Sequence, residues 1–194
     1  MAVTYSQNGV IVRNADSVKI GDSYYRTVTI NGLEWICSDL LWSDNLINGG
    51  DSPTSSAAYF YTNGDASYNH LFYNHAAIDY FLSSDVFGNG WRIPTLSVWQ
   101  SLLTEYTTYQ LRSKYGWHNN TGVTNITQMS IIGSGFMNER SPHFWNLSEL
   151  NNYWTQTKDG SQYKIFQMVA DTVNSFTENV NFRAFSIRLV RDAT

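Results

Sequence analysis

The sequence predicts an α+β domain with antiparallel sheets, two helices and a loop-rich C-terminal half. Two segments in the first half carry apolar residues at helical spacing, whereas stretches in the second half alternate between apolar and polar residues. Aromatic residues make up 15% of the 194 residues and charged residues only 14%. This composition favours strands and turns over long helices.

The first residues are interpreted as an arm that precedes the domain. Residues 1–16 form this arm and residues 17–194 form one domain, a length that buries about 70% of its unfolded surface. Within the arm, Gly9–Asn14 alternates enough for a short strand. The arm is expected to be either an attachment or oligomer contact or an edge strand that completes the sheet of the domain.

The strongest local pattern is a β-hairpin. Thr27–Ile30 alternates at period two, and Asn31-Gly32 is the dipeptide that adopts positive φ in a two-residue turn before Leu33–Ile36. Residues 42–69 are expected to form loop because turn-forming Asn, Asp and Gly surround the aromatic run Tyr59–Tyr61.

Two helices are expected between residues 68 and 106. The first opens at Tyr68 or Asn69 and ends before Ser83, as its apolar spacing indicates. The second follows Thr95, whose hydroxyl can accept a backbone N–H of the first turn, and it fades around Tyr106. Pro94 cannot continue a helix from upstream, so the preceding Trp91-Arg92-Ile93 is expected to be extended, with Trp91 and Ile93 buried.

The second half is expected to form strands. Tyr153–Thr157, Tyr163–Val169 and Phe185–Val190 alternate at period two and are interpreted as an antiparallel meander. Gly133-Ser134-Gly135 is expected to be a bulge or a close approach of two backbones.

Six short segments, taken in order, resemble the pattern of a known family. Gly90–Thr95 followed by Trp99 resembles the signature of the Fibrobacter succinogenes major paralogous domain, a branch of the C-type-lectin-like superfamily that has phage-borne members. The other segments are Tyr25–Ile36, Leu71–Ala77, Leu111–Ser113 with Gly116-Trp117, Asn152–Thr155, and Ala184–Asp192. The resemblance implies a C-type-lectin-like fold over residues 17–194, with the N- and C-terminal strands paired in one sheet.

No catalytic residue is expected from the sequence. Some lectin-like proteins are formylglycine-generating oxidases that use two cysteines near the C-terminus, but this chain has only Cys37, which is interpreted as a buried strand residue. His70 and His75 are expected to pack or cap, and His118 and His143 to be solvated. The chain is therefore predicted not to be an enzyme.

Cofactor, metal, nucleic-acid and membrane partners are not expected either. Calcium-dependent lectins hold their ion through Glu-Pro-Asn or Gln-Pro-Asp and Trp-Asn-Asp, none of which occurs here. The net charge of −4 without a basic run argues against nucleic acid and anionic membranes. No stretch approaches the length of a membrane span. Met1–Asn8 has neither the basic nor the apolar part of a secretory signal.

Aromatic and amide residues crowd the segment from Arg140 to Arg183. Aromatic rings offer rigid contact area and amides offer adaptable hydrogen bonds, as in antibody-like binding surfaces. In the lectin-like superfamily this region forms the exposed ligand-binding face. Among the aromatic residues of the second half, Trp154, Phe166 and Phe185 are expected to be core. The candidate ligand-binding residues are Trp145, Tyr163, Phe176, Asn181 and Arg183.

These observations lead to a functional expectation. The chain is predicted to be a non-catalytic recognition module, a phage fibre or capsid-decoration protein on the virion surface that presents a calcium-independent surface to a host glycan or surface protein. It is expected to form a homo-oligomer or to contact virion proteins through its N-terminal arm. The alternative is a purely structural assembly protein of a virion or surface without a separate ligand. The alternative locations are the bacterial cell surface and secretion.

Overall fold

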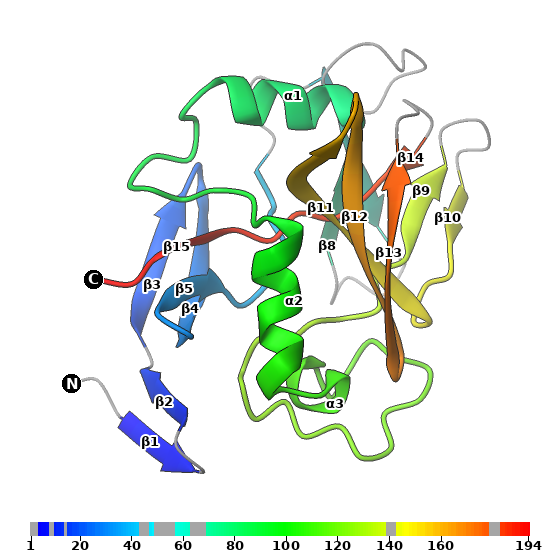
Figure 1. The fold of residues 1–194 in the computed structure, drawn as a ribbon. Helices are drawn as coiled ribbons and strands as arrows, with labels where there is room; N and C mark the ends of the chain where they lie inside the picture. Colours follow the sequence, from blue (N-terminus) through cyan, green and yellow to red (C-terminus); the bar gives the residue numbers. More distant parts are fainter. Residues whose placement is uncertain are drawn as a thin grey trace.

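The computed structural model describes residues 4–7, 10–13, 15–42, 47–48, 57–62, 69–138, 143–178 and 183–194. In these residues the chain is α+β with mostly antiparallel sheets, as predicted (Figure 1). The elements are, in chain order, β1 (Thr4–Gln7), β2 (Val10–Arg13), β3 (Ala15–Ile20), β4 (Ser23–Ile30), β5 (Leu33–Ile36), β6 (Ile47–Asn48), β7 (Ala57–Thr62), β8 (Asn69–Tyr73), α1 (His75–Ser83), α2 (Leu96–Glu105), α3 (Thr108–Leu111), β9 (Phe136–Asn138), β10 (His143–Trp145), β11 (Leu150–Asp159), β12 (Gln162–Val169), β13 (Thr172–Glu178), β14 (Arg183–Ala184) and β15 (Val190–Asp192).

The two ends of the domain meet in one four-stranded sheet, ordered β15-β5-β4-β3. The predicted hairpin is present as β4 and β5, and its turn residues Asn31 and Gly32 have φ of 53° and 72°, the positive values that a tight hairpin turn needs. β15 pairs with β5 so that Val190 lies opposite Trp35. The expected pairing of N- and C-terminal strands is confirmed (Figure 1).

The strand expected within the N-terminal arm is also present. It is β2, and it pairs with β1 in a separate two-stranded sheet, with Thr4 opposite Arg13. Among the described strands, the outer edge of the four-stranded sheet is β3 rather than β2. Most of the arm therefore forms a hairpin of its own, whereas its last two residues, Ala15 and Asp16, already belong to the edge strand β3.

The first predicted helix starts later than expected. Residues 69–73 form strand β8, which pairs with β7, and α1 begins only at His75. Tyr73 is held extended by reciprocal backbone hydrogen bonds with Phe185, 2.9 and 3.0 Å long, and the Asn74 side chain then caps α1 by accepting from the Ala77 N–H at 2.9 Å. The loop expected over residues 42–69 is likewise interrupted by β6 and β7, and the remainder of that loop lies outside the described residues.

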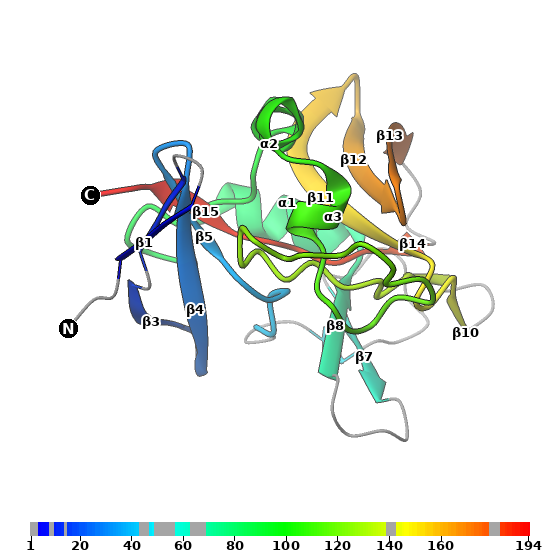
Figure 2. The same cartoon turned by 90° about the horizontal axis from the view of Figure 1, so that it is seen from below.

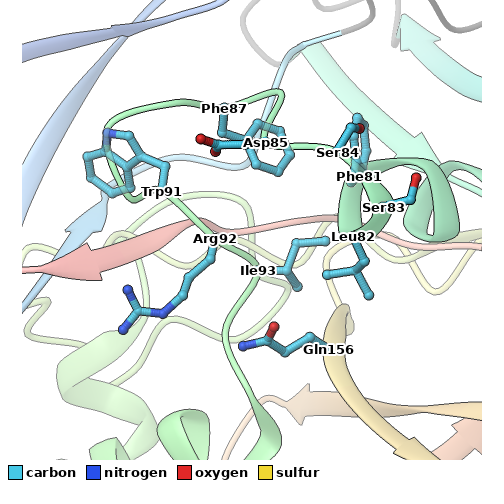
Figure 3. Close-up of a pocket in the computed structure, with 10 residues that line it drawn as sticks. All are labelled: Phe81, Leu82, Ser83, Ser84, Asp85, Phe87, Trp91, Arg92, Ile93 and Gln156. Carbon is cyan, nitrogen blue, oxygen red and sulfur yellow. The ribbon is translucent and has the colours of Figure 1, made fainter.

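The second helix and the segment before it match the prediction. Thr95 Oγ1 accepts from the Val98 N–H at 3.1 Å and starts α2. Upstream, Arg92 forms an antiparallel bridge with Val190, which keeps the segment extended. Trp91 and Ile93 alternate with Arg92 and are buried (Figure 3).

The predicted meander is present, but its third strand is different. β11 and β12 match the prediction, whereas the third strand is β13 rather than 185–190. A tight turn around Ala170 returns the chain at once to pair along β12. Residues 185–189 run instead as a buried extended segment with isolated bridges from Phe185 to Tyr73 and from Ser186 to Tyr153. This segment crosses the middle of the molecule, from the side of the meander to the four-stranded sheet that contains β15 (Figure 1).

Two aromatic clusters hold the layers together. In the first, Trp99 of α2 stacks on Phe166 at 4.6 Å and on Tyr153 at 4.8 Å between ring centres. The ring of Trp35, in the four-stranded sheet, lies 4.9 Å from the ring of Trp99. α2 thus joins the meander to the terminal sheet, and it lies beside β11 and β12 when the molecule is seen from below (Figure 2).

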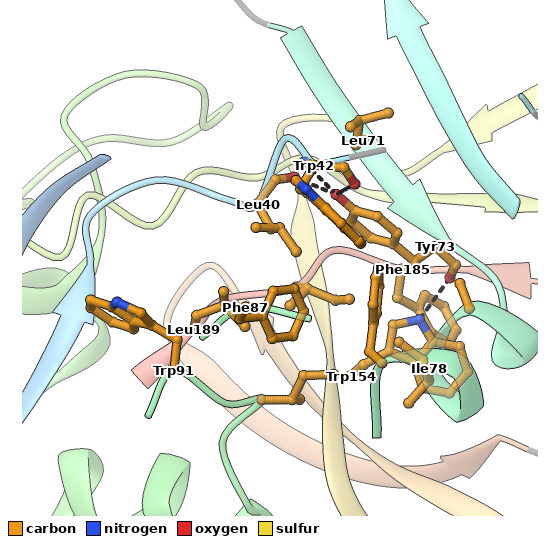
Figure 4. Close-up of a cluster of buried hydrophobic side chains, with 14 of the residues drawn as sticks. Leu40, Trp42, Leu71, Tyr73, Ile78, Phe87, Trp91, Trp154, Phe185 and Leu189 are labelled. Carbon is orange, nitrogen blue, oxygen red and sulfur yellow. Dashed lines mark hydrogen bonds between the residues drawn. The ribbon is translucent and has the colours of Figure 1, made fainter. Parts of the chain in front are cut away.

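The second cluster surrounds Tyr73 and Trp154 (Figure 4). Trp154 Nε1 donates to the Tyr73 carbonyl at 2.7 Å, and its ring lies 5.0 Å from that of Phe185. The Tyr73 hydroxyl bonds the backbone of Leu40 and Trp42. Trp154, Phe166 and Phe185 are buried, which confirms their prediction as core.

Cys37 is buried, as predicted, but it lies just beyond β5 rather than in a strand. Burial raises the pKa of its thiol, and the positive charges of Arg188 and Arg26 offset this only in part. A thiol with a raised pKa is a poor nucleophile, so Cys37 acts as a small core residue.

Candidate binding surface

A small three-stranded sheet, ordered β10-β9-β14, carries the candidate site. Trp145 pairs with Phe136, and Arg183 pairs with Asn138. Because cross-strand partners and alternate residues share a face, these four residues lie on one face of the sheet. We call this the Trp145 face.

The opposite face of the same sheet is buried. Met137 and Ala184 form a core cluster with Phe72, and Phe144 packs against it. The rings of Phe72 and Phe144 lie 5.5 Å apart. The Trp145 face is partly covered as well, because Phe136 packs against the core cluster that contains Phe185, and the residues of this face that are exposed to solvent are Trp145 and Arg183.

Trp145 and Arg183 are exposed on the Trp145 face. Trp145 keeps 47% of its surface accessible, a large fraction for an indole that could otherwise be buried. The guanidinium carbon of Arg183 lies 5.6 Å from the centre of the half-buried Phe136 ring, within the range of a cation–π contact. The face therefore combines an open aromatic ring with a positive charge held over a second ring.

The backbone around Gly135 fixes the position of Trp145. Gly135 has φ of +71°, and a Cβ at this residue would lie 2.1 Å from the Trp145 carbonyl oxygen. A Cβ on Gly133 would likewise meet the backbone of Gly116 and Ser148 at 2.9 to 3.0 Å. The expected close approach of backbones is confirmed, and it gives Trp145 a rigid support.

Phe176 borders the Trp145 face from the meander. The ring centre of Phe176 lies 6.1 Å from that of Phe185. The ring centre of Phe136 also lies 6.1 Å from that of Phe185. Phe176 and Phe136 thus flank one buried ring, which places β13 beside the small sheet, as Figure 1 also shows. Phe176 is half-buried and belongs partly to the core.

The structure corrects one of the predicted surface residues. Tyr163 is only 1% exposed, because it shares the inward face of β12 with Ile165 and lies 6.0 Å from the Trp154 ring. Its hydroxyl donates to Asp79 Oδ1 at 2.7 Å, and burial raises its pKa. Tyr163 is therefore core, as its alternation with Ile165 could have indicated, and Asn181 lies outside the described residues.

Phe136 and Asn138 were not among the site residues predicted from the sequence. Both lie on the Trp145 face, yet the sequence suggested only a glycine feature just before them. The alternation of Phe136, Met137 and Asn138 is a weak strand signal, and it becomes informative only once the partner strands are known.

The histidines and carboxylates of the described part do not gather into a catalytic or metal-binding cluster. His75 Nδ1 lies 3.2 Å from Asp79 Oδ2, and its ring lies 5.0 Å from that of Tyr163. His70 is buried and His118 exposed, as predicted, and the side chain of His143 lies outside the described residues. Among the residues that the structure describes, no three His, Cys, Asp or Glu side chains are grouped so that they could hold a metal.

Comparison of the chain with protein-family models, with curated proteins and with solved structures gave no match. In the described part of the chain, none of the helices has the length and apolar character of a membrane span.

Proposed function

We propose that this chain is a non-catalytic recognition module of the C-type-lectin-like superfamily, and that its Trp145 face binds a glycan on a host cell surface. The observation that carries the proposal is the placement of an exposed indole and an exposed guanidinium, from Trp145 and Arg183, on one face of the small sheet. The opposite face of the same sheet packs against the core through Met137 and Ala184, which anchors the sheet that carries both residues.

The chemistry of the Trp145 face suits a sugar. The indole of Trp145 offers a flat apolar surface on which the C–H face of a pyranose ring can stack. Arg183 and Asn138 supply hydrogen-bonding groups beside it for ring hydroxyls. Trp has only two side-chain torsions, so little conformational entropy is lost when its ring is ordered by a ligand.

The assignment to the lectin-like superfamily is supported by what the resembling residues do. Arg191 of the last segment lies 4.6 Å over the Trp91 ring of the first, and its Nε donates to Glu34 Oε2 at 2.6 Å. Trp154 Nε1 of another such segment donates to the carbonyl of Tyr73 in a third at 2.7 Å. The resembling segments thus contact one another and build the frame, which leaves recognition to the segments between them.

The proposed setting is the surface of a phage virion, with the domain present in several copies. A single small aromatic face binds sugars weakly, and several copies on one particle raise the overall avidity without any new contact. The arm β1–β2, a hairpin separate from the four-stranded sheet, is the part proposed to contact other copies or virion proteins.

The experiment is binding of the purified domain to a glycan array and to intact bacterial cells, with and without EDTA, together with its mass in solution. We expect saturable binding that resists EDTA and falls at least about tenfold in Trp145→Ala. Tyr24→Ala is the matched control, because it removes a 70% exposed aromatic ring from β4. A stable multimer that binds neither glycans nor cells would instead support the structural alternative.

A further inference from the structure

A second site lies away from the Trp145 face. A cavity of about 300 Å³ opens between the end of α1, the extended segment before α2, and β11 (Figure 3). This volume is at the lower end of the range for small-molecule pockets. We call it the α1 pocket, and its main lining residues are Leu82, Asp85, Phe87, Trp91, Ile93 and Gln156.

The floor of the α1 pocket is apolar and its rim is polar. Phe87, Trp91 and Ile93 are buried core residues, so the floor is fixed by the packing of the domain. Leu82 and Asp85 are exposed at the rim, and the half-buried Gln156 lies at the opposite end of the pocket from Asp85, with Ile93 between them (Figure 3). A ligand in the pocket would thus meet a carboxylate at one end, an apolar surface in the middle and an amide at the other end.

The charges around the pocket leave a net negative site. Arg92 also lines it, but its guanidinium is paired with Asp192 at 2.7 Å. Lys158, which follows Gln156 along β11, is paired with Asp79 at 3.7 Å. Within the described residues the Asp85 carboxylate has no hydrogen-bond or ion-pair partner, so it is the charge that remains uncompensated.

The end of α1 adds to this negative field. The last turn of a helix presents unpaired carbonyls and a partial negative charge, and α1 has no basic residue in its last turn. Ser83 and Ser84 donate to the Tyr80 carbonyl, while the helix end as a whole faces the pocket (Figure 3). A cation is favoured here over an anion or a neutral group.

We propose that the α1 pocket binds the protonated amine of a small organic molecule. The ammonium group would bond the Asp85 carboxylate, and the carbon skeleton would rest on Leu82 and Ile93. The Gln156 amide, which has no side-chain partner in the described part of the chain, would bond a hydroxyl of the ligand. An amino sugar and an aliphatic amine share this chemistry. The site is independent of the Trp145 face, since the two share no residue.

The test is a ¹H–¹⁵N NMR titration of the full chain with glucosamine, n-butylammonium and the neutral N-acetylglucosamine, each up to about 10 mM. We expect one or both amines to shift resonances of Leu82, Asp85 and the Gln156 side-chain amide, with a Kd in the millimolar range. N-acetylglucosamine should bind with an affinity at least about fivefold lower, as judged from the shifts of the same resonances. A response to glucosamine alone identifies an amino sugar as the ligand class, and a response to butylammonium alone an aliphatic amine.

The variants separate this site from a general charge effect. Asp85→Asn should weaken amine binding at least about fivefold. Asp22→Asn removes the same charge from a side chain that is 91% exposed, and it should change nothing. Trp145→Ala should also leave amine binding intact. The proposal is overturned if neither amine perturbs the pocket, if the neutral sugar binds as well as glucosamine, or if a folded Asp85→Asn protein binds unchanged.

Discussion

Arg183 and Arg188 lie on the same C-terminal segment, and their surroundings are opposite. Arg183 is exposed on the Trp145 face, with its guanidinium over the Phe136 ring. Arg188 is fully buried and donates to Asp39 Oδ1 at 2.7 Å and to the Tyr153 hydroxyl at 3.1 Å. The same residue type therefore lies on the proposed recognition surface at one position and in the core of the fold at the other.

The buried network around Asp39 shows why Arg188 cannot be exchanged freely. Asp39 also accepts from the Tyr153 hydroxyl at 2.8 Å, and Arg188 Nη1 donates to the Met129 carbonyl at 2.7 Å and the Ile36 carbonyl at 3.1 Å. The nearby carboxylate and tyrosine keep the pKa of Arg188 raised despite its burial. A buried charge of this kind is tolerated only while its partners remain in place.

The largest expected effect is that of Arg188→Met. This change leaves the Asp39 carboxylate buried without its cation, so we expect the free energy of unfolding in urea to fall by about 3–5 kcal/mol. Arg183→Met should change it by less than about 0.5 kcal/mol, because Arg183 is exposed. Equal losses of unfolding free energy in the two variants would show that the buried Arg188 contributes no more to stability than the exposed Arg183.

The next effect is that of Gly135→Ala, which connects the frame to the Trp145 face. The alanine Cβ would clash with the Trp145 carbonyl oxygen, and the alanine backbone would have to keep the positive φ of Gly135. We therefore expect a loss of about 2 kcal/mol in the free energy of unfolding and weaker glycan binding. Gly160→Ala is the control, because Gly160 has φ of +62° but nothing within 4 Å of an added Cβ. It should cost only about 1 kcal/mol and leave binding intact. If binding survives Gly135→Ala unchanged, the rigid support of Trp145 is not needed.

A smaller effect is expected from Arg183→Ala on binding alone. Loss of the guanidinium should weaken glycan binding by about five- to tenfold, while stability stays within about 0.5 kcal/mol. Arg183→Lys keeps the charge but loses the planar group, and should restore binding in part. Titration on immobilised glycan measures the affinity of both variants, and urea unfolding measures their stability. Full affinity in Arg183→Ala would remove this residue from the site.

The smallest effect concerns pH. Burial lowers the pKa of His70, and the charge of Asp39 offsets this only in part. The unfolded chain then binds a proton more readily than the folded one, so stability declines as pH falls through the unfolded pKa of about 6.5. Urea unfolding between about pH 7.5 and pH 5 should show a smaller decline in His70→Gln than in the wild type. Parallel curves would contradict this role of His70.

The features that the sequence predicted well are those specified by neighbouring residues. Asn31-Gly32 dictates its own turn, and Pro94-Thr95 dictates the start of α2, because backbone preference and capping act within a few residues. The predictions failed where a distant partner decides. Residues 69–73 are a strand because β7 and Phe185 pair with them, and such pairing leaves little local trace.

The candidate site was predictable only in part for the same reason. Trp145 and Arg183 are exposed, as expected, but their common face depends on the pairing of β9 with both β10 and β14. Tyr163 was misplaced because aromatic residues suit both a core and a binding surface. The residues that line the α1 pocket lie between Phe81 and Ile93 except for Gln156, and the sequence did not predict the pocket because its shape depends on how this segment folds back against β11.

The central claim is that the Trp145 face is the recognition surface, separate from the frame that folds the chain. It is tested most directly by measuring cell or glycan binding and unfolding free energy on the same preparations of wild type and Trp145→Ala. We predict that binding falls at least about tenfold while stability changes by less than about 0.5 kcal/mol. Unchanged binding, or a loss of binding that merely follows a loss of stability or of oligomeric mass, would contradict the claim.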